Sequence, residues 1–281
     1  MRTVFCITAL LFNIIALSQS PTQQAQSIVE EGKLLYRSEM ASWYGTDLFL
    51  AKHPNRDNIS GYFSYTDGAV TKCIFYSKDK EPKVIGTMSF DSTYNVKTAN
   101  VDLTERDFTS FENQLYQLRK NTLNEIQADT GLFKRFENTD LNLIPVINNN
   151  ERKVYVLTGP QQEGVVLIGN DYLLRFDESN HLLTKKRLHK SLIPIYYGGQ
   201  QKGQQVEGAM HTHLPETGDF ITATDVCTLM LYEKFAGWKT HNVVSKNYLN
   251  IWNCETNQLT VIPMSTLDKI NKDEQNKNKK D

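Results

Sequence analysis

The most informative stretch of the sequence for the fold is Val206 to Phe235, VEGAMHTHLPETGDFITATDVCTLMLYEKF. It predicts a short strand ending in His211 and His213, then a polar loop, then a helix that carries Asp225 near its start. Successive side chains on a strand alternate between faces, so the two imidazoles point the same way, about 7 Å apart. Together with the Asp225 carboxylate they can form a three-ligand metal site, and an open fourth position is typical of catalytic zinc.

The spacing in this stretch resembles the signature of JAB/MPN (JAMM) metallopeptidases. That signature is His-x-His-Pro, about six residues, Ser, two residues and Asp, with a Glu on an earlier strand. His211 and His213 match the two histidines, Thr222 falls at the Ser position and Asp225 at the metal-binding Asp. The gap is one residue longer here, because Leu214 precedes the Pro. The resemblance covers roughly residues 107 to 263.

The resemblance implies a zinc-dependent peptidase, isopeptidase or amidase that acts on a peptide or a peptide-crosslinked polymer. Zinc would be bound by the two histidines and Asp225, and Thr222 would stabilise the oxyanion. Glu163 is the expected general base, because it is followed by an apolar run that ends in glycine, as the Glu of the family is. Glu207 is its rival, because it faces the same way as His211, but it would lie about 13 Å along the strand. The alternative is a non-catalytic exported binding or scaffold module that retains the fold.

Structural explanations compete with the metal site. Thr222 and Asp225 also form a capping-box pattern, in which both side chains satisfy free amides at a helix start. His189 and His241 have no partner at ligand spacing, and we interpret them as surface or hydrogen-bonded histidines, while His181 lies in a predicted turn. The HxH-containing amidohydrolase-type barrels are excluded, because too little chain follows His213 for a barrel of about 250 residues.

The N-terminus predicts export. Met1 to Ser20 combines a basic residue with a nearly continuous apolar run and small residues suited to cleavage, so it resembles a signal peptide. The apolar run is shorter than the about 20 residues of a membrane span, and we expect no transmembrane segment after cleavage. A secreted or periplasmic location follows. The net charge of −1 argues against nucleic acid as a partner.

Cysteine usage permits at most one disulfide. Beyond the signal, the chain has Cys73, Cys227 and Cys254, an odd number for an oxidising compartment. Cys227 and Cys254 flank the same predicted helix-to-strand region and are the pair we would suspect. The sequence has no C-x-x-C pair and therefore offers no thiolate zinc site.

The whole chain predicts an α+β fold with a mostly antiparallel sheet and flanking helices. Residues 1–20 are the signal, 21–104 a helix plus a β-rich segment, 105–265 the JAB/MPN-like domain and 266–281 a disordered tail. Apolar residues at helical spacing predict a helix at Ile28–Trp43, and a turn at Tyr44-Gly45-Thr46 is expected after it. Asp67-Gly68 predicts a hairpin turn, and Thr104 to Asp107 a capping box that opens a helix to about Ala128. The later elements are predicted as strands at Leu141–Ile147, Val154–Leu157, Val165–Phe176, Leu182–Ile195, Val206–His213, Asn242–Ser245, Tyr248–Asn253 and Leu259–Pro263, with a helix at Asp225–Ala236.

Overall fold

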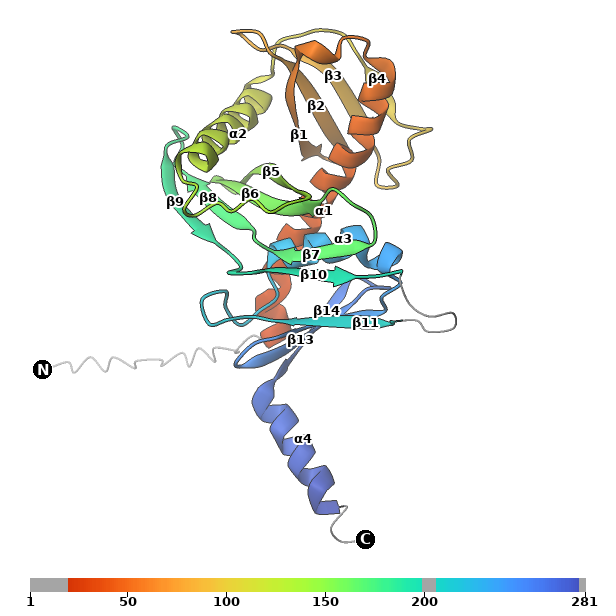
Figure 1. Ribbon diagram of the computed structural model, residues 1–281, viewed down its shortest axis with the longest axis vertical. Helices are drawn as coiled ribbons and strands as arrows, with labels where there is room; N and C mark the ends of the chain where they lie inside the picture. Colours follow the sequence, from red (N-terminus) through yellow and green to blue (C-terminus); the bar gives the residue numbers. More distant parts are fainter. Residues whose placement is uncertain (1–19, 199–205, 278–281) are drawn as a thin grey trace, which may run out of the picture.

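The computed structural model describes residues 20–198 and 206–277, and within them the chain has an α+β fold, as predicted (Figure 1). The helices are α1 (Pro21–Lys52), α2 (Ser110–Ala128), α3 (Ala223–Ala236) and α4 (Met264–Lys277), with a 3-10 turn, η1, at Arg56–Asn58. The strands are β1 (Ile59–Asp67), β2 (Val70–Ser77), β3 (Val84–Phe90), β4 (Asn100–Asp102), β5 (Thr139–Asn148), β6 (Glu151–Pro160), β7 (Val165–Gly169), β8 (Tyr172–Phe176), β9 (Leu182–Arg187), β10 (Leu192–Tyr196), β11 (Gly208–Thr212), β12 (Thr240–Val244), β13 (Tyr248–Asn253) and β14 (Gln258–Pro263).

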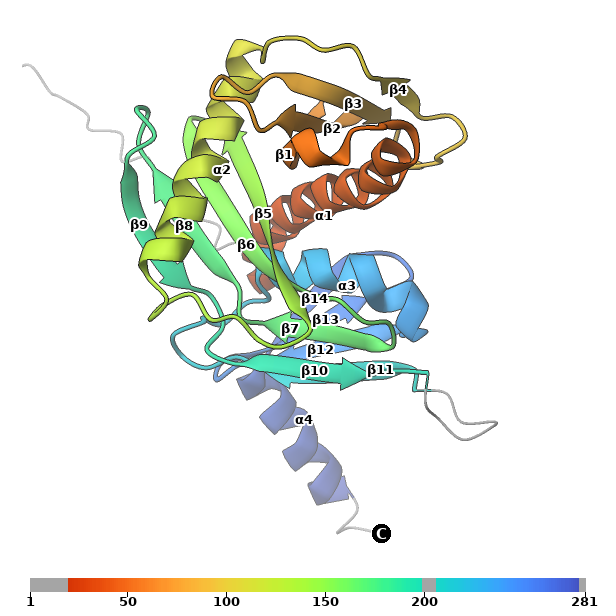
Figure 2. The same cartoon turned by 45° about the horizontal axis from the view of Figure 1, so that its top comes forward.

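These strands form three four-stranded sheets and one two-stranded sheet. β1 to β4 pair in sequence order near one end of the molecule, and β5, β6, β8 and β9 form the second sheet beside α2 (Figure 2). β7 pairs only with β10. In the last sheet, β11 pairs parallel with β12, while β13 and β14 follow antiparallel. The predicted hairpin at Asp67-Gly68 is confirmed, with Asp67 paired to Val70.

Helix α1 is longer than the predicted Ile28–Trp43 helix. It begins at a capping box in which Ser20 and Gln23 satisfy each other's amides, and Pro21 occupies the first turn, where its missing N–H costs nothing. Gly45, expected to form a turn, lies inside the helix. A Cβ at Gly45 would lie 2.8 Å from Cys73 Cβ, so glycine there permits close packing of α1 on β2.

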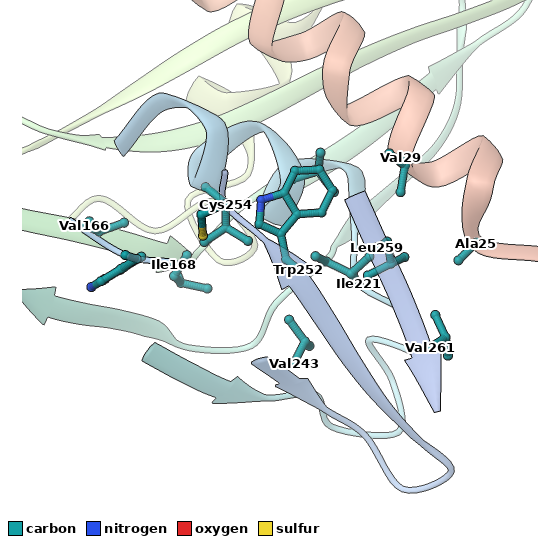
Figure 3. Packing of buried hydrophobic residues seen from close by; sticks show 13 residues of the cluster. Ala25, Val29, Val166, Ile168, Ile221, Val243, Trp252, Cys254, Leu259 and Val261 are labelled. Carbon is teal, nitrogen blue, oxygen red and sulfur yellow. The ribbon is translucent and has the colours of Figure 1, made fainter. Parts of the chain in front are cut away.

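Helix α1 connects the apolar cores. Its first turns place Ala25 and Val29 in a cluster with Trp252, whose side chain lies among residues from α1, β7 and the last sheet (Figure 3). Further along, Leu35 joins a second cluster, and Phe49 packs against the β1–β4 sheet in a third. The N-terminal helix therefore contributes to both predicted halves of the chain, and Trp252 is its largest fully buried partner.

Several local predictions were wrong. α2 is capped by Thr109 and Glu112 rather than by Thr104. Arg106 also holds the Glu112 side chain, with 2.7 Å between Arg106 Nη1 and Glu112 Oε2. The run predicted as a strand from Val165 to Phe176 is divided after Gly169, where the chain turns.

The tail from residue 266, expected to be disordered, continues as α4 to Lys277. Cys73, Cys227 and Cys254 are free and buried, so the suspected Cys227–Cys254 disulfide does not form. The signal predicted for residues 1–20 lies outside the described residues except for Ser20. Within the described part of the chain, no helix combines the length and apolar character needed to cross a membrane.

Candidate metal centre

Four side chains from separate elements converge at one buried point. They are His189, His211, His213 and Asp225, and one ligand atom from each lies within 4.8 Å of all the others. Strand alternation positions the two predicted histidines, since His211 is 4% exposed whereas the neighbouring Met210 is 59% exposed. Both imidazoles and the Asp225 carboxylate therefore meet as predicted, and His189 is an additional member.

The start of α3 fixes Asp225. Its backbone N–H donates to Thr222 Oγ1 at 3.0 Å, and its Oδ2 accepts from the Thr222 N–H at 2.9 Å. This is the predicted capping box. The same Oδ2 lies 3.1 Å from His213 Nε2, so Asp225 caps its helix and faces the histidines at once. The positive end of the helix dipole also favours a negative charge at this position.

A turn between β7 and β8 brings His189 into the group. Gly169 (φ +92°) and Asn170 (φ +51°) adopt backbone conformations that reverse the chain. A Cβ at Gly169 would lie 2.2 Å from Ser191 O and 3.1 Å from His189 Cβ, so only glycine allows this approach. The turn places Asp171 beside His189, and the two side chains meet at 2.7 Å between Oδ1 and Nδ1.

Five separations within the group, measured to one or the other oxygen of Asp225, are close to those of a tetrahedral zinc site. His213 Nε2 lies 3.0 Å from His189 Nε2, 3.1 Å from His211 Nε2 and 3.1 Å from Asp225 Oδ2. Asp225 Oδ1 lies 3.4 Å from His189 Nε2 and 3.5 Å from His211 Nε2. In a regular tetrahedron, zinc bonds of about 2.0–2.2 Å place the ligands about 3.3–3.6 Å apart. The group therefore needs only small shifts to surround one ion.

The contacts of the outer ring nitrogens show which nitrogen of each histidine faces the centre of the group. A carboxylate only accepts, so Asp171 fixes the hydrogen of neutral His189 on Nδ1 and leaves the Nε2 lone pair facing inward. His211 Nδ1 contacts His241 Nε2 at 2.8 Å, and His213 Nδ1 is buried without a hydrogen-bond partner among the described residues. Three inward-facing Nε2 atoms this close repel unless a proton or a metal cation lies between them. The buried group can hold a metal ion.

Without an ion, charge pairing inside the group is strong. Burial lowers the pKa of His189, but the Asp171 and Asp225 carboxylates outweigh that effect and raise the pKa well above its usual value. Burial raises the pKa of Asp225, and the charges of His189 and His211 reverse this, so the pKa is well below its usual value. Burial and the adjacent His211 lower the pKa of His241 to about 3, so His241 is neutral.

The group is shut off from solvent. The side chains of His211 and His213 are 0% exposed, that of Asp225 is 1% exposed and that of His189 is 7% exposed. His189 Nε2 occupies the position that a water molecule would take if His211, His213 and Asp225 were the only ligands. Four protein ligands without an open position are typical of structural rather than catalytic zinc.

The structure does not bring the predicted general base to this point. Glu163 precedes β7, whereas His189 lies against Gly169 at the far end of that strand, about 20 Å away by strand length. Glu163 instead lines a cavity with Trp43 and Tyr232. The distance along β7 therefore argues against Glu163 as the base.

The other two predicted side chains are engaged elsewhere. Glu207 forms an ion pair with Lys239 near the start of β11, away from the four converging groups. The Thr222 hydroxyl accepts from the Asp225 N–H and lies 2.9 Å from Thr224 Oγ1. Thr222 therefore positions Asp225, and its oxyanion role stays a prediction.

Sequence reasoning missed His189, His241 and Asp171. The prediction that His189 and His241 lie outside the site was wrong for His189, which belongs to the group. His241 contacts His211 from the neighbouring strand and supports it, a role that the prediction did not include. One signal was available: Gly169-Asn170-Asp171 has the composition of a turn, and a turn there predicts that β7 ends early. Nothing in the sequence indicated that this turn would meet His189.

Comparisons of the chain with protein-family models, with curated proteins and with solved structures find no match. The resemblance to JAB/MPN metallopeptidases therefore rests on the residues His211, His213, Thr222 and Asp225.

Proposed function

We propose that this protein is an exported zinc-binding module whose ion is a structural crosslink, bound by His189, His211, His213 and Asp225. The observation that carries the proposal is the position of His189 Nε2, 3.0 Å from His213 Nε2 and 3.4 Å from Asp225 Oδ1. This nitrogen completes a four-ligand set. With side chains at most 7% exposed, the set leaves no position for a substrate.

The chemistry of the donors favours zinc. Three imidazole nitrogens and one carboxylate oxygen suit zinc, which accepts tetrahedral nitrogen and oxygen ligands without a geometric preference of its own. Copper binds such ligands tightly but prefers a tetragonal arrangement. The supporting residues also fit, because Asp171 accepts the outer hydrogen of His189 and holds the ring in place.

The ion would link side chains from three parts of the chain. His189 follows β9, His211 and His213 belong to β11 and its extension, and Asp225 begins α3. The three cysteines are free in the structure and supply no covalent link between these elements. A metal ion that binds only the folded chain raises the free energy of unfolding by RT ln(1 + [L]/Kd). This amounts to about 4 kcal/mol when the free metal concentration is 1,000 times Kd.

Metal analysis and cobalt substitution test the proposal. We expect one zinc per chain in the purified protein, and the cobalt form should show the intense visible absorption of four-coordinate Co²⁺. Azide should leave that spectrum unchanged, because no ligand position exchanges. His189→Ala should open a position and make the spectrum azide-sensitive, while His181→Ala, a histidine 80% exposed at its side chain, should behave as wild type. An azide-sensitive wild-type spectrum would overturn the closed centre.

A second candidate is a zinc-dependent hydrolase of amide or isopeptide bonds in a peptide or peptide-crosslinked polymer. It is favoured by the family-like spacing of His211, His213 and Asp225 and by the Asp171–His189 pair. A histidine oriented by a carboxylate is a common general base, so His189 would accept a proton in place of the expected Glu. Zinc would supply the Lewis acid, and His189 would have to move outward to let substrate enter.

The His189→Ala variant separates the two candidates. For the structural centre, this variant binds zinc more weakly, and the wild-type protein shows no turnover of peptide or isopeptide substrates. For the hydrolase, the wild-type protein shows turnover, and His189→Ala keeps its zinc but loses that activity. Zinc content and substrate turnover, measured on the same samples, therefore identify which function the histidine serves.

A further inference from the structure

Two adjoining cavities form a cleft where β7 begins, at the far end of this strand from the metal centre. Their volumes are about 280 and 700 Å³, and they share Trp43, Pro160 and Tyr232. Cavities of about 300–1,000 Å³ commonly bind small molecules or single side chains. The shared residues show that the two cavities lie side by side.

Exposed aromatic rings form one wall of the cleft. Trp43 from α1 is 44% exposed and Phe235 from α3 is 61% exposed, and their rings stack at a centroid separation of 6.2 Å. The ring centroid of Tyr232 also lies 6.2 Å from that of Trp43. Large rings left open to solvent next to a cavity offer an apolar, electron-rich surface to a ligand.

Carboxylates face the same cleft, and none of them forms an ion pair within the part of the chain that the structure describes. Glu39, Asp47 and Asp140 line the smaller cavity and Glu163 lines the larger one. No lysine or arginine is among the described residues that line either cavity. The contacts to these groups come from neutral amides: Asn142 Nδ2 donates to Glu39 at 3.1 Å, and Gln161 Nε2 donates to Asp140 at 3.0 Å.

Glu39 is the most recessed of these groups. It keeps some exposed surface because it lines the cavity, while the surrounding protein removes much of its hydration. Burial raises its pKa to about 7, and the hydrogen bond from Asn142 offsets only part of that. A recessed carboxylate with no positive partner gains stability when a ligand supplies the missing charge.

We propose that this cleft binds an organic polycation, that is, ammonium or guanidinium groups carried on a hydrocarbon chain. Trp43, Tyr232 and Phe235 would contact the hydrocarbon and the cation faces, and Glu39, Asp47, Asp140 and Glu163 would pair with the positive groups. A lysine-containing peptide and a free polyamine share this chemistry. The site lies about 20 Å from His189 by strand length and does not depend on the metal centre.

Isothermal titration of the full chain tests the proposal, with tetralysine and spermidine as the two probes. We expect saturable binding that weakens at least tenfold in 0.5 M salt and disappears when the lysines of the peptide are acetylated. Tighter binding of tetralysine would identify a peptide ligand, and tighter binding of spermidine a free polyamine. Quenching of Trp43 fluorescence should follow the same curve, because the other two tryptophans, Trp238 and Trp252, are buried.

Matched variants locate the binding. Glu39→Gln removes the charge but keeps an acceptor for Asn142, and it should weaken binding about tenfold. Asp47→Asn, at an exposed position, should weaken binding several-fold. Glu178→Gln removes an exposed charge on a distant turn and should have no effect. Equal affinity in Glu39→Gln, Asp47→Asn and wild type, no binding of either probe, or equally tight salt-independent binding of a neutral oligosaccharide would overturn the proposal.

Discussion

The two ends of helix α3 each bury one carboxylate, and the two behave in opposite ways. Asp225 in the first turn faces the imidazoles of His189 and His211, and electrostatic attraction and hydrogen bonds from these rings keep its pKa well below the usual value despite its burial. Glu233 in the last turn is 2% exposed and accepts a hydrogen bond from Trp252 Nε1 at 3.0 Å. Burial raises its pKa to about 7, although the bonds from Trp252 and Cys254 oppose this.

This difference distinguishes a carboxylate that can bind a metal from a buried carboxyl group with a structural role. Both residues are buried, and both are hydrogen-bonded, so neither property identifies a site. What separates them is the chemistry of the partners, since an imidazole can give up a proton and bind a metal cation whereas an indole N–H is a donor only. The helix dipole reinforces the contrast, because it favours an anion at the first turn and disfavours one at the last.

The largest effect is expected from Asp225→Asn. The amide keeps an oxygen for the helix cap but removes the charge that the histidines and the ion require, so metal binding should be lost. Breaking a buried charged group typically costs about 3–5 kcal/mol of unfolding free energy. Metal analysis and urea unfolding with and without EDTA measure both. EDTA should destabilise the wild type and leave Asp225→Asn unchanged. An equal response to EDTA in both would show that the ion is bound elsewhere.

A smaller effect is expected from Asp171→Asn. This change weakens the contact that orients His189, and losing such an outer carboxylate typically lowers metal affinity about 10- to 100-fold. Competition with a fluorescent zinc chelator measures the affinity. Asp177→Asn is the matched control, because Asp177 contacts the exposed His181 in a similar pair at 3.2 Å. Equal losses in the two variants would contradict a supporting role for Asp171.

The Glu233→Gln variant should gain stability relative to the wild type as the pH rises. The folded-state pKa of Glu233 lies above its unfolded value of 4.5, so the native state binds this proton more tightly. The wild type therefore loses stability as the pH rises from about 4.5 through 7, and the neutral amide of the variant avoids that loss. The difference in unfolding free energy should grow by about 3 kcal/mol between pH 4.5 and pH 8. A difference that stays constant with pH would show that Glu233 is ionised in the folded protein.

The smallest effect is expected from reducing agent. Cys227 lies on α3 and Cys254 contacts Glu233, and both are free and buried. The melting temperature should therefore be the same with and without reductant, and a thiol reagent should react only after unfolding. A melting temperature that falls on reduction would mean that these two cysteines pair.

Sequence alone predicted the parts of this protein that depend on local rules. Strand alternation placed His211 and His213 on one buried face, and the capping pattern placed Asp225 at a helix start. The hairpin at Asp67-Gly68 and the α+β class follow from turn chemistry and element order. These signals act over a few residues, so they do not depend on contacts with distant parts of the chain.

Features that depend on distant contacts were beyond the sequence. His189 joins the site because Gly169 lets the end of β7 approach Ser191, and that approach depends on how β7 pairs with β10. Glu163 matched the family pattern in its local context, but the direction of β7 places it at the opposite end. The full length of α1 depends on its packing against β2 at Gly45.

Helix α1 and helix α3 touch where Gly32 lies against Val226, the residue that follows Asp225. A Cβ at Gly32 would lie 2.5 Å from Val226 Cβ and 2.9 Å from Ala223 O. A fragment cut at the predicted boundary before residue 105 would lack this contact and leave the apolar face of α3 uncovered. Dissection of the chain at that boundary should therefore not yield an autonomous domain that contains the four-residue group, since the first helix packs against the turn that presents Asp225.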